Sequence, residues 1–268
     1  MKKQLLALLC LLFFISTLNA QSLFMKDFYD GKNSLSFNYS RLAYENSKSK
    51  LFNGVYKLGY MHPVSSNLAI EGQISYINNS GDTGFYSTSE SGIGNIYLGI
   101  NKLTDSGNSN YSLGIYIPTA SDNVLTNPEL FVTNYNMGEL SNNGVLIRGN
   151  YQYQKKYRNG LILGIEAGPD FWIATNDDTK DNFEMFIHAA GKIGYDFGKL
   201  KLFGEIGNQF IVTEDPTRFK DRFSTHFGLG AAYNFGNYEI GFNYKNTFDK
   251  TATDVTGSFG VNFRMIGF

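Results

Sequence analysis

Long segments of alternating apolar and polar residues run through this chain, and they restrict its fold more than any other feature. Between Phe223 and Phe235, most odd-numbered positions carry large apolar side chains, whereas Ser, His, Gly and Asn occupy most of the positions between them. Successive side chains of a β-strand point to opposite faces, so this period of two predicts a strand with one apolar and one polar face. The pattern recurs in 238–245 and 255–263.

Twelve segments show this alternation, and most of them are longer than strands of soluble proteins. They cover residues 33–43, 52–61, 67–77, 92–102, 109–117, 144–154, 160–173, 183–197, 199–212, 222–235, 237–248 and 254–264. Soluble strands commonly have about five or six residues, whereas a tilted strand needs about 9–11 to cross a bilayer. The lengths therefore favour strands that span a membrane.

Longer and shorter linkers alternate between these segments. The short linkers, such as 62–66 and 103–108, contain turn residues, and the longest linker covers 118–143. Outer-membrane barrels have short periplasmic turns and longer external loops. We therefore predict an all-β fold, a closed antiparallel transmembrane β-barrel of about twelve strands with both ends on the periplasmic side. Closure is required because lipid offers no partner to an unpaired sheet edge.

The composition agrees with a β-barrel and excludes other classes. Charged residues make up 18% of the chain, below the roughly 25% of an average soluble domain. After the first twenty residues there is no apolar run of about eighteen residues, so no membrane-spanning helix is expected. The formal net charge of −1 gives no reason to propose nucleic-acid binding.

Residues 1–20 have the layout of a secretory signal peptide. Lys2 and Lys3 precede an apolar run from Leu5 to Ile15, and a short polar region ends at Ala20. The run is too short for a spanning helix. We expect cleavage after Ala20, a single barrel domain over 21–268, and a short lead-in over 21–32. The only cysteine, Cys10, lies in the predicted signal peptide, so no disulfide is expected in the mature chain.

One face of the segments is almost free of charge, and the other carries most ionisable residues. The candidates for lining the lumen are Lys57, Glu71, Arg148, Glu166, Asp170, His188, Lys192, Glu205, Arg222, His226, Glu239, Lys245 and Arg264. In a membrane barrel the apolar face meets lipid and the polar face lines the interior. Two hypotheses remain open for the charged face: ion pairs that rigidify a narrow barrel, or a polar path for solutes.

The predicted interior contains two histidines, which raises the alternative of a lipid-modifying enzyme. Such chemistry pairs a histidine with a serine nucleophile, but neither His188 nor His226 has a serine at the close spacing of such a motif. Ser112, Ser224 and Ser258 share the inward phase. We predict that the protein is not an enzyme, and we expect no cofactor and no metal, since the acidic stretch 176–181 lacks the spacing of a calcium-binding loop.

The linker 118–143 contains seven large apolar residues, more than a solvated loop normally carries. They are Leu125, Leu130, Phe131, Val132, Tyr135, Met137 and Leu140. We predict that this linker packs onto or into the barrel.

Two neighbouring stretches resemble a known family. Residues 90–100 read ESGIGNIYLGI and residues 111–121 read YSLGIYIPTAS. This resembles the G-x-G-D-x-x-L-G and P-T-G-S region of outer-membrane transporters of the phenol-degradation (meta-pathway) family. Asn95 and Ala120 stand where that family has Asp and Gly. The resemblance implies a channel or transporter for small molecules, apolar ones included, and transfers no functional residue.

Two further features concern the source and the assembly of the barrel. The Ala20–Gln21 junction and the Asn-, Tyr- and Lys-rich composition resemble outer-membrane proteins of Bacteroidetes-type bacteria. Phe268 is similar to the terminal aromatic residue through which barrel assembly machinery recognises its substrates, although it is out of phase with Phe263. The expected partners are outer-membrane lipid, this assembly machinery and a small-molecule solute.

We hold three hypotheses for function. The first is passage of small solutes through the barrel. The second is a plugged barrel whose external loops bind a partner, and the third is the lipid-modifying enzyme.

Overall fold

The computed structural model describes residues 23–44, 54–82, 87–120, 137–139, 144–175, 182–213, 223–248 and 255–268. Within these ranges the regular elements are antiparallel strands and one 3-10 turn, η2 (Met137–Glu139). The same ranges contain no helix with the length and apolar character needed to cross a membrane. The predicted signal peptide lies outside them.

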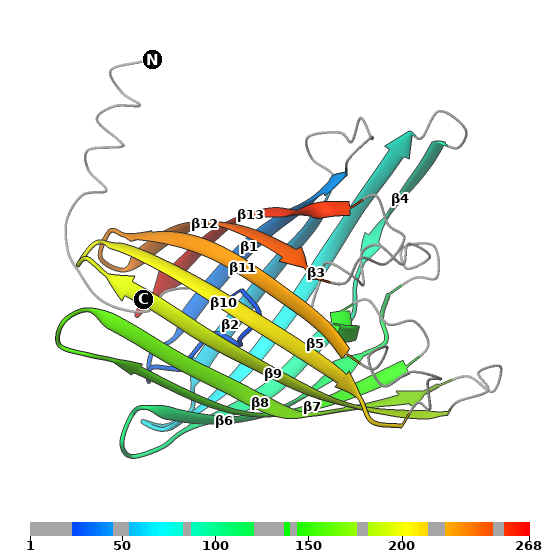
Figure 1. Ribbon diagram of the computed structural model, residues 1–268. Helices are drawn as coiled ribbons and strands as arrows, with labels where there is room; N and C mark the ends of the chain where they lie inside the picture. Colours follow the sequence, from blue (N-terminus) through cyan, green and yellow to red (C-terminus); the bar gives the residue numbers. More distant parts are fainter. Residues whose placement is uncertain are drawn as a thin grey trace.

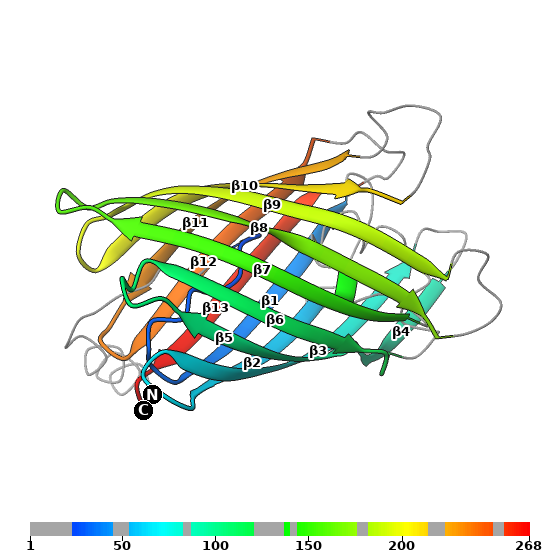
Figure 2. The same cartoon turned by 90° about the horizontal axis from the view of Figure 1, so that it is seen from below.

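The strands form one closed barrel (Figures 1 and 2). They are β1 (Ser34–Tyr44), β2 (Gly54–Pro63), β3 (Leu68–Asp82), β4 (Ser87–Ile93), β5 (Ile96–Leu103), β6 (Ser109–Ile117), β7 (Gly144–Lys156), β8 (Leu161–Ala174), β9 (Phe183–Asp196), β10 (Leu200–Ile211), β11 (Phe223–Asn234), β12 (Tyr238–Thr247) and β13 (Val255–Ile266). Strands that follow one another in the chain pair with each other, except β4 with β5. β1 pairs with both β2 and β13, which closes the sheet. Because β4 and β5 both pair with β3, they are two parts of one interrupted strand. The predicted twelve-stranded barrel is confirmed.

Some predicted boundaries were wrong. The segment 92–102 is interrupted at Gly94 and Asn95, and the predicted linker 78–91 contains the paired ends of β3 and β4. In Figure 1 this hairpin extends beyond the other strands. Its sequence is rich in Ser, Asn and Gly and lacks apolar alternation. A strand shows this alternation only where one of its faces is apolar, so the pattern gave no sign of the hairpin. The last strand also continues to Ile266, past its predicted end.

The short turns gather at one end of the barrel, where β1 begins and β13 ends (Figure 1). We call this the short-turn end and the opposite one the long-linker end. Gly198 and Gly236 have φ angles of +96° and +87° in the turns before β10 and β12, and glycine adopts this region without steric cost. The sorting of linkers by length agrees with the sequence prediction.

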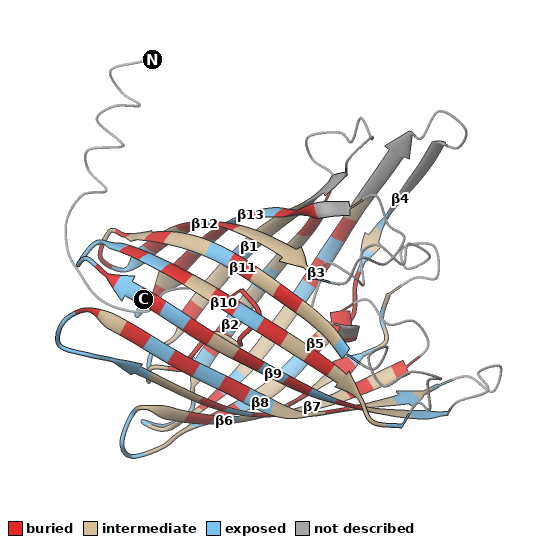
Figure 3. Ribbon diagram, viewed as in Figure 1, coloured by how far each residue is buried: buried red, intermediate tan, exposed pale blue. Residues whose placement is uncertain are grey.

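Buried and exposed residues alternate along the wall, as the striping of β8, β9 and β10 in Figure 3 shows. Many of the exposed positions carry large apolar side chains, and the buried ones include most of the charged residues of these three strands. Outward side chains such as Ile193 and Leu229 are 61% and 62% exposed, whereas Lys201 and Arg264 are each 1% exposed. Large apolar groups on the outside and charges on the inside are the reverse of a soluble barrel. This arrangement identifies the outer surface as a lipid-facing one.

Aromatic side chains concentrate toward both ends of the outer surface. At the short-turn end Tyr195 packs on Phe197, with ring centroids 4.6 Å apart, and at the long-linker end Phe171 packs on Phe183. Ile and Leu occupy the belt between them, including Ile187 and Ile193 on β9. From Phe183 to Tyr195, roughly 3.3 Å per residue at a tilt of about 40° gives about 30 Å along the membrane normal, close to the hydrocarbon thickness.

Candidate functional site

The chain before β1 enters the barrel and crosses its interior. The backbone N–H groups of Leu23, Phe24 and Met25 all donate to Glu205 Oε2, at 2.8, 2.8 and 3.2 Å. The next N–H, that of Lys26, donates to Glu166 Oε2 at 2.6 Å. These acceptors lie on β10 and β8 and are buried. We call Leu23–Lys26 the lumen segment.

The lumen segment reaches the opposite wall through its lysine. Lys26 Nζ lies 2.6 Å from Glu71 Oε2 on β3 and donates to the Tyr97 hydroxyl on β5 at 2.8 Å. Gln152 Nε2 on β7 donates to the Lys26 carbonyl at 2.7 Å. Burial lowers the pKa of Lys26, but the attraction of Glu71 and Tyr97 outweighs burial, so this pKa lies above its ordinary value. The segment is thus bonded to walls on both sides.

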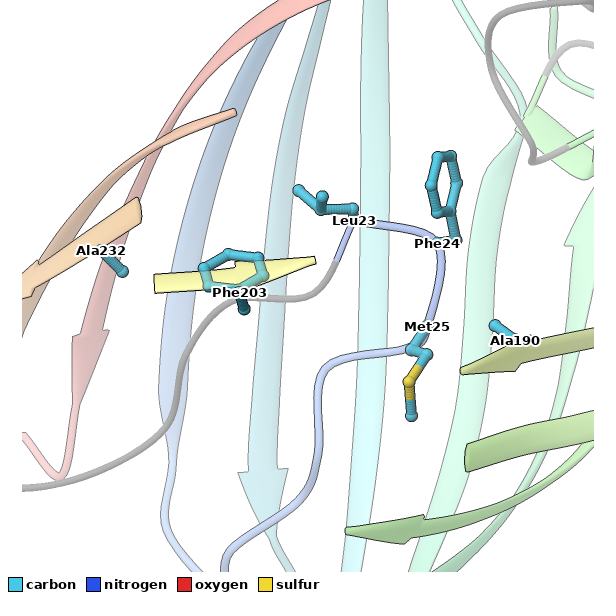
Figure 4. Packing of buried hydrophobic residues seen from close by; sticks show 6 residues of the cluster. All are labelled: Leu23, Phe24, Met25, Ala190, Phe203 and Ala232. Carbon is cyan, nitrogen blue, oxygen red and sulfur yellow. The ribbon is translucent and has the colours of Figure 1, made fainter. Parts of the chain in front are cut away.

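Apolar contacts also hold the lumen segment. Leu23, Phe24 and Met25 form a buried cluster with three side chains from the barrel wall (Figure 4). These are Ala190 on β9, Phe203 on β10 and Ala232 on β11. Other buried apolar clusters lie around Tyr29 and Met61 and around Tyr97 and Leu146, so this one is a local apolar contact among several. Backbone hydrogen bonds, an ion pair and packing therefore combine to hold the lumen segment inside the barrel.

A charged cluster lies on the wall beside the lumen segment. Arg148 binds Asp170 through Nε and Nη2, at 2.8 and 2.6 Å, the two-point geometry that makes such pairs strong. His188 Nδ1 lies 3.2 Å from Asp170 Oδ1, and its Nε2 lies 3.3 Å from Asn150 Oδ1. Asp170 and His188 are fully buried. This cluster fits the hypothesis of ion pairs that rigidify the barrel.

Further ion pairs occupy the other levels. Lys192 Nζ lies 3.1 Å from Glu205 Oε1, so that glutamate serves both a lysine and the lumen segment. Toward the short-turn end, Lys201 pairs with Glu239 at 3.0 Å. Arg264 on β13 is 1% exposed and donates to Ser34 Oγ at 3.4 Å.

At the long-linker end, part of the 118–143 linker lies inside the barrel. Glu139 of η2 is 1% exposed. Its carboxylate lies 2.6 Å from Lys57 Nζ and accepts a bond from Gln73 Nε2 at 2.9 Å. Glu139 of this linker therefore lies inside the barrel. Residues 121–136 and 140–143 lie outside the described residues, so the packing of the linker's apolar residues stays a prediction.

The interruption between β4 and β5 anchors both sides of this linker. Asn95 Oδ1 accepts the N–H groups of Thr119 and Ala120, both at 3.1 Å. Asn95 also donates to the Gly138 and Glu139 carbonyls. At Gly94 an added Cβ would lie 2.3 Å from Ser75 Oγ, so only glycine fits there. These residues belong to the two stretches that carry the family resemblance, and the geometry gives their physical role.

A cavity of about 160 Å³ remains between the lumen segment, Glu139 and the wall. Hydroxyl and amide groups of β1, β12 and β13 line one side of it, including Ser36, Asn38, Asn243 and Asn262. The ionisable residues of the lining are four cations and four acids: Lys26, Lys57, Arg148 and Lys245, and Asp27, Glu71, Glu139 and Glu166. This cavity suits a polar molecule that can accept hydrogen bonds.

The predicted lumen candidates are placed as follows. Buried side chains are those of Glu166, Asp170, His188, Lys192, Glu205, His226, Glu239 and Arg264, and partly buried ones are those of Lys57, Glu71, Arg148 and Lys245. Arg222 lies outside the described residues. Lys26, Tyr97 and Glu139 also contribute to the site, although no pattern in the sequence marked them as lumen residues.

The two interior histidines do not share one catalytic arrangement. His188 contacts the Asp170 carboxylate, whereas His226 Nε2 lies 2.8 Å from Ser224 Oγ. The residues paired with His226 on the adjacent strands are Gly207 and Thr247, neither of which is acidic. Among the described residues there is also no group of three His, Cys, Asp or Glu side chains that could hold a metal ion. This geometry offers no support for the enzyme hypothesis.

Several solved structures share this fold. An outer membrane channel of the COG4313 group from Pseudomonas putida F1 has 14% sequence identity and a TM-score of 0.63, over 92% of this chain and 100% of that one. LpxR from Salmonella typhimurium has 11% identity and a TM-score of 0.53, over 87% and 99%. The KdgM porin has 8% identity and a TM-score of 0.51, over 87% and 98%. At these identities the likeness shows the fold alone.

A search among curated proteins finds no match. The sequence profile of the family described as "Putative MetA-pathway of phenol degradation" matches residues 32–265. This range covers the barrel strands except for Ile266, the last residue of β13, so the resemblance noted from two stretches extends over nearly all of the described chain. The chain belongs to this family of outer-membrane β-barrels.

Proposed function

We propose that the protein is a channel for small polar solutes that is held closed by its own lumen segment. The observation that carries the proposal is the convergence of three backbone N–H groups on Glu205, with a fourth on Glu166. Leu23–Lys26 is joined to the wall by non-covalent contacts and is continuous with the wall only through the chain that leads to β1. Release of these contacts would open a polar path without breaking the barrel.

The solute class follows from the cavity lining. The family resemblance suggested that apolar molecules are included, but amides, hydroxyls and lysines surround the cavity. Placing an apolar molecule there would leave those groups without partners, at about 1–3 kcal/mol for each group. The lining therefore favours polar solutes.

We also propose that residues 1–20 direct export and that barrel assembly machinery inserts the chain. The segment Leu23–Lys26 would then follow closely after the new N-terminus at Gln21. Phe268 is 55% exposed and lies beyond the end of β13. Its ring contacts that of Tyr60 instead of continuing the strand.

Conductance in planar bilayers tests the channel proposal. The purified protein should be mostly closed, and a variant that lacks residues 23–26 should conduct steadily. A variant with alanine at positions 23–25 keeps the backbone N–H groups that bind Glu205 and loses only the packing of the side chains. It should therefore open less often than the variant that lacks residues 23–26. Silence of all three proteins, each shown to be folded by its gel shift on boiling, would contradict the channel and support a plugged barrel.

A further inference from the structure

Glu139 occupies a position in which a carboxylate is bound by groups of the barrel wall. Lys57 Nζ lies 2.6 Å from one carboxylate oxygen and donates to the other at 2.7 Å. Gln73 Nε2 adds a bond at 2.9 Å. A fully buried carboxylate with three such contacts is a built site whose present occupant comes from the same chain.

The carboxylate is not what holds η2 in place by itself. The backbone around Glu139 is fixed by Asn95, whose N–H and side-chain amide donate to the carbonyls of Glu139 and Gly138 at 3.0 and 2.9 Å. The side chain can therefore leave the site while the backbone stays anchored. The Glu139 carboxylate, which occupies the site, is thus held independently of the η2 backbone that carries it.

A second lysine reaches the same cavity. Lys245 lies on β12, and its paired residues on the adjacent strands are Gly228 and Ser258. Within the described ranges no carboxylate lies within 4.0 Å of its ammonium group. Its recorded close neighbour is the Phe24 ring, 5.7 Å from Nζ to the centroid. Lys57, Glu139 and Glu205 act on it electrostatically, and Glu205 is already bonded to Lys192.

Four cations and four carboxylates line the cavity, namely Lys26, Lys57, Arg148 and Lys245, and Asp27, Glu71, Glu139 and Glu166. Lys26, Lys57 and Arg148 each lie within 4.0 Å of a carboxylate, that of Glu71, Glu139 and Asp170 respectively. Among the described residues, Lys245 is therefore the lining cation at which an added carboxylate could pair. The adjoining cavity of about 160 Å³ is similar to the roughly 150 Å³ of an engineered protein cavity that holds benzene. A small organic acid would fit this volume, with its carboxylate at the lysines and its body along the buried rings of Tyr97 and Tyr116.

We propose that Lys57, Gln73 and Lys245 form a binding site for the carboxylate of a small organic acid, and that Glu139 occupies part of this site in the closed barrel. The inference deepens the proposed function, because it names the class of solute that the lumen receives. The biological role of the site rests on the proposed channel function. The binding itself does not, since it can be measured without transport.

The test is direct binding to the purified full-length protein in detergent. The probes are acetate and benzoate labelled with ¹³C at the carboxyl carbon, compared with the neutral acetamide and benzamide, and binding is followed by NMR line broadening. At least one acid should bind ten times more tightly than its amide. Failure of both acids to outbind their amides would overturn the site.

Two variants and a control locate the site. Lys245→Gln should weaken binding of the acid at least fivefold. Glu139→Gln should strengthen it at least fivefold, because the competing carboxylate is gone and Lys57 is released. Lys199→Gln, which removes an exposed lysine in a turn at the short-turn end, should change nothing. Unchanged or weaker binding by Glu139→Gln would refute the role of Glu139 as an occupant.

Failure of this proposal and failure of the channel are distinguishable. Acid binding with the expected response of the variants, but without conductance of the protein lacking residues 23–26, would keep the site and reject the channel. Conductance without a preference for acids over amides would keep the channel and reject the site.

Discussion

Replacing Glu205 by glutamine should release the lumen segment. The carboxylate makes two kinds of contact. Its Oε2 accepts hydrogen bonds from three backbone N–H groups, and its Oε1 lies 3.1 Å from Lys192 Nζ. A glutamine of the same shape keeps one oxygen acceptor, for which Lys192 and the backbone N–H groups must compete. It also removes the negative charge that strengthens each bond.

The magnitude follows from the number of bonds. Hydrogen bonds to charged groups contribute about 1.5–3 kcal/mol each, and neutral ones about 0.5–1.5. Losing about 1 kcal/mol at each of three bonds gives about 3 kcal/mol. Since about 1.4 kcal/mol corresponds to a factor of ten, the ratio of open to closed barrels should rise by about a hundredfold in Glu205→Gln.

Single-channel recording measures this ratio, and the barrel supplies a matched control. Glu239 is also a buried glutamate paired with a lysine, Lys201, at 3.0 Å. It lies on β12, where its paired residues on the adjacent strands are Asn234 and Arg264. Glu239→Gln therefore makes the same chemical change elsewhere in the lumen and should leave the open fraction near that of the wild type. An equal rise in both variants would point to general loosening, and no rise in Glu205→Gln would refute the closing role of the three bonds.

Two further predictions concern the barrel wall, both measured as the free energy of unfolding from vesicles in urea. An alanine Cβ at Gly168 would lie 2.0 Å from the Gly149 carbonyl oxygen, whereas at Gly72 its nearest neighbour would be a leucine methyl at 3.8 Å. Gly168→Ala should therefore destabilise the barrel by about 1–3 kcal/mol, and Gly72→Ala should have a smaller effect. Equal stability of the two variants would contradict the reasoning. Leu229→Arg, in the middle of lipid-facing β11, should cost about 2–4 kcal/mol, and Val64→Arg, in a turn, about 0–1; a similar cost at both positions would argue against the assigned lipid belt.

The barrel could be predicted from the sequence because its determinants are local. The alternation in Phe223–Phe235, for example, is read from one segment and gives both the strand and its two faces. Placing those strands side by side needed only the short turns between them. The choice between a soluble and a membrane barrel followed from the size of the apolar side chains and the length of each segment.

The contacts of the lumen segment could not be predicted in this way. Leu23 and Glu205 are 182 residues apart, and the donors are backbone N–H groups, which every non-proline residue has. Nothing in the sequence around Leu23 marks those groups as bound. Glu139 was missed for a related reason: it lies in a linker without periodicity, and its partner Lys57 is on a distant strand. One signal was present, since the stretches around Gly94 and Thr119 stood out as a motif before their junction was known.

The lumen segment and η2 are both held in the barrel by hydrogen bonds to carboxylates, but the wall and the inserted chain exchange the roles of donor and acceptor. At the lumen segment the carboxylates belong to the wall and the donors to the inserted chain, whereas at η2 the carboxylate belongs to the inserted chain and the donors to the wall. An organic acid can replace Glu139 at the wall lysines without loss of hydrogen bonds. It cannot replace the lumen segment in that way, because departure of the segment exposes Glu71, Glu166 and Glu205, which repel an anion. Acid binding at η2 and opening at the lumen segment are therefore separate steps, and an acid that fills the first site does not by itself drive the second.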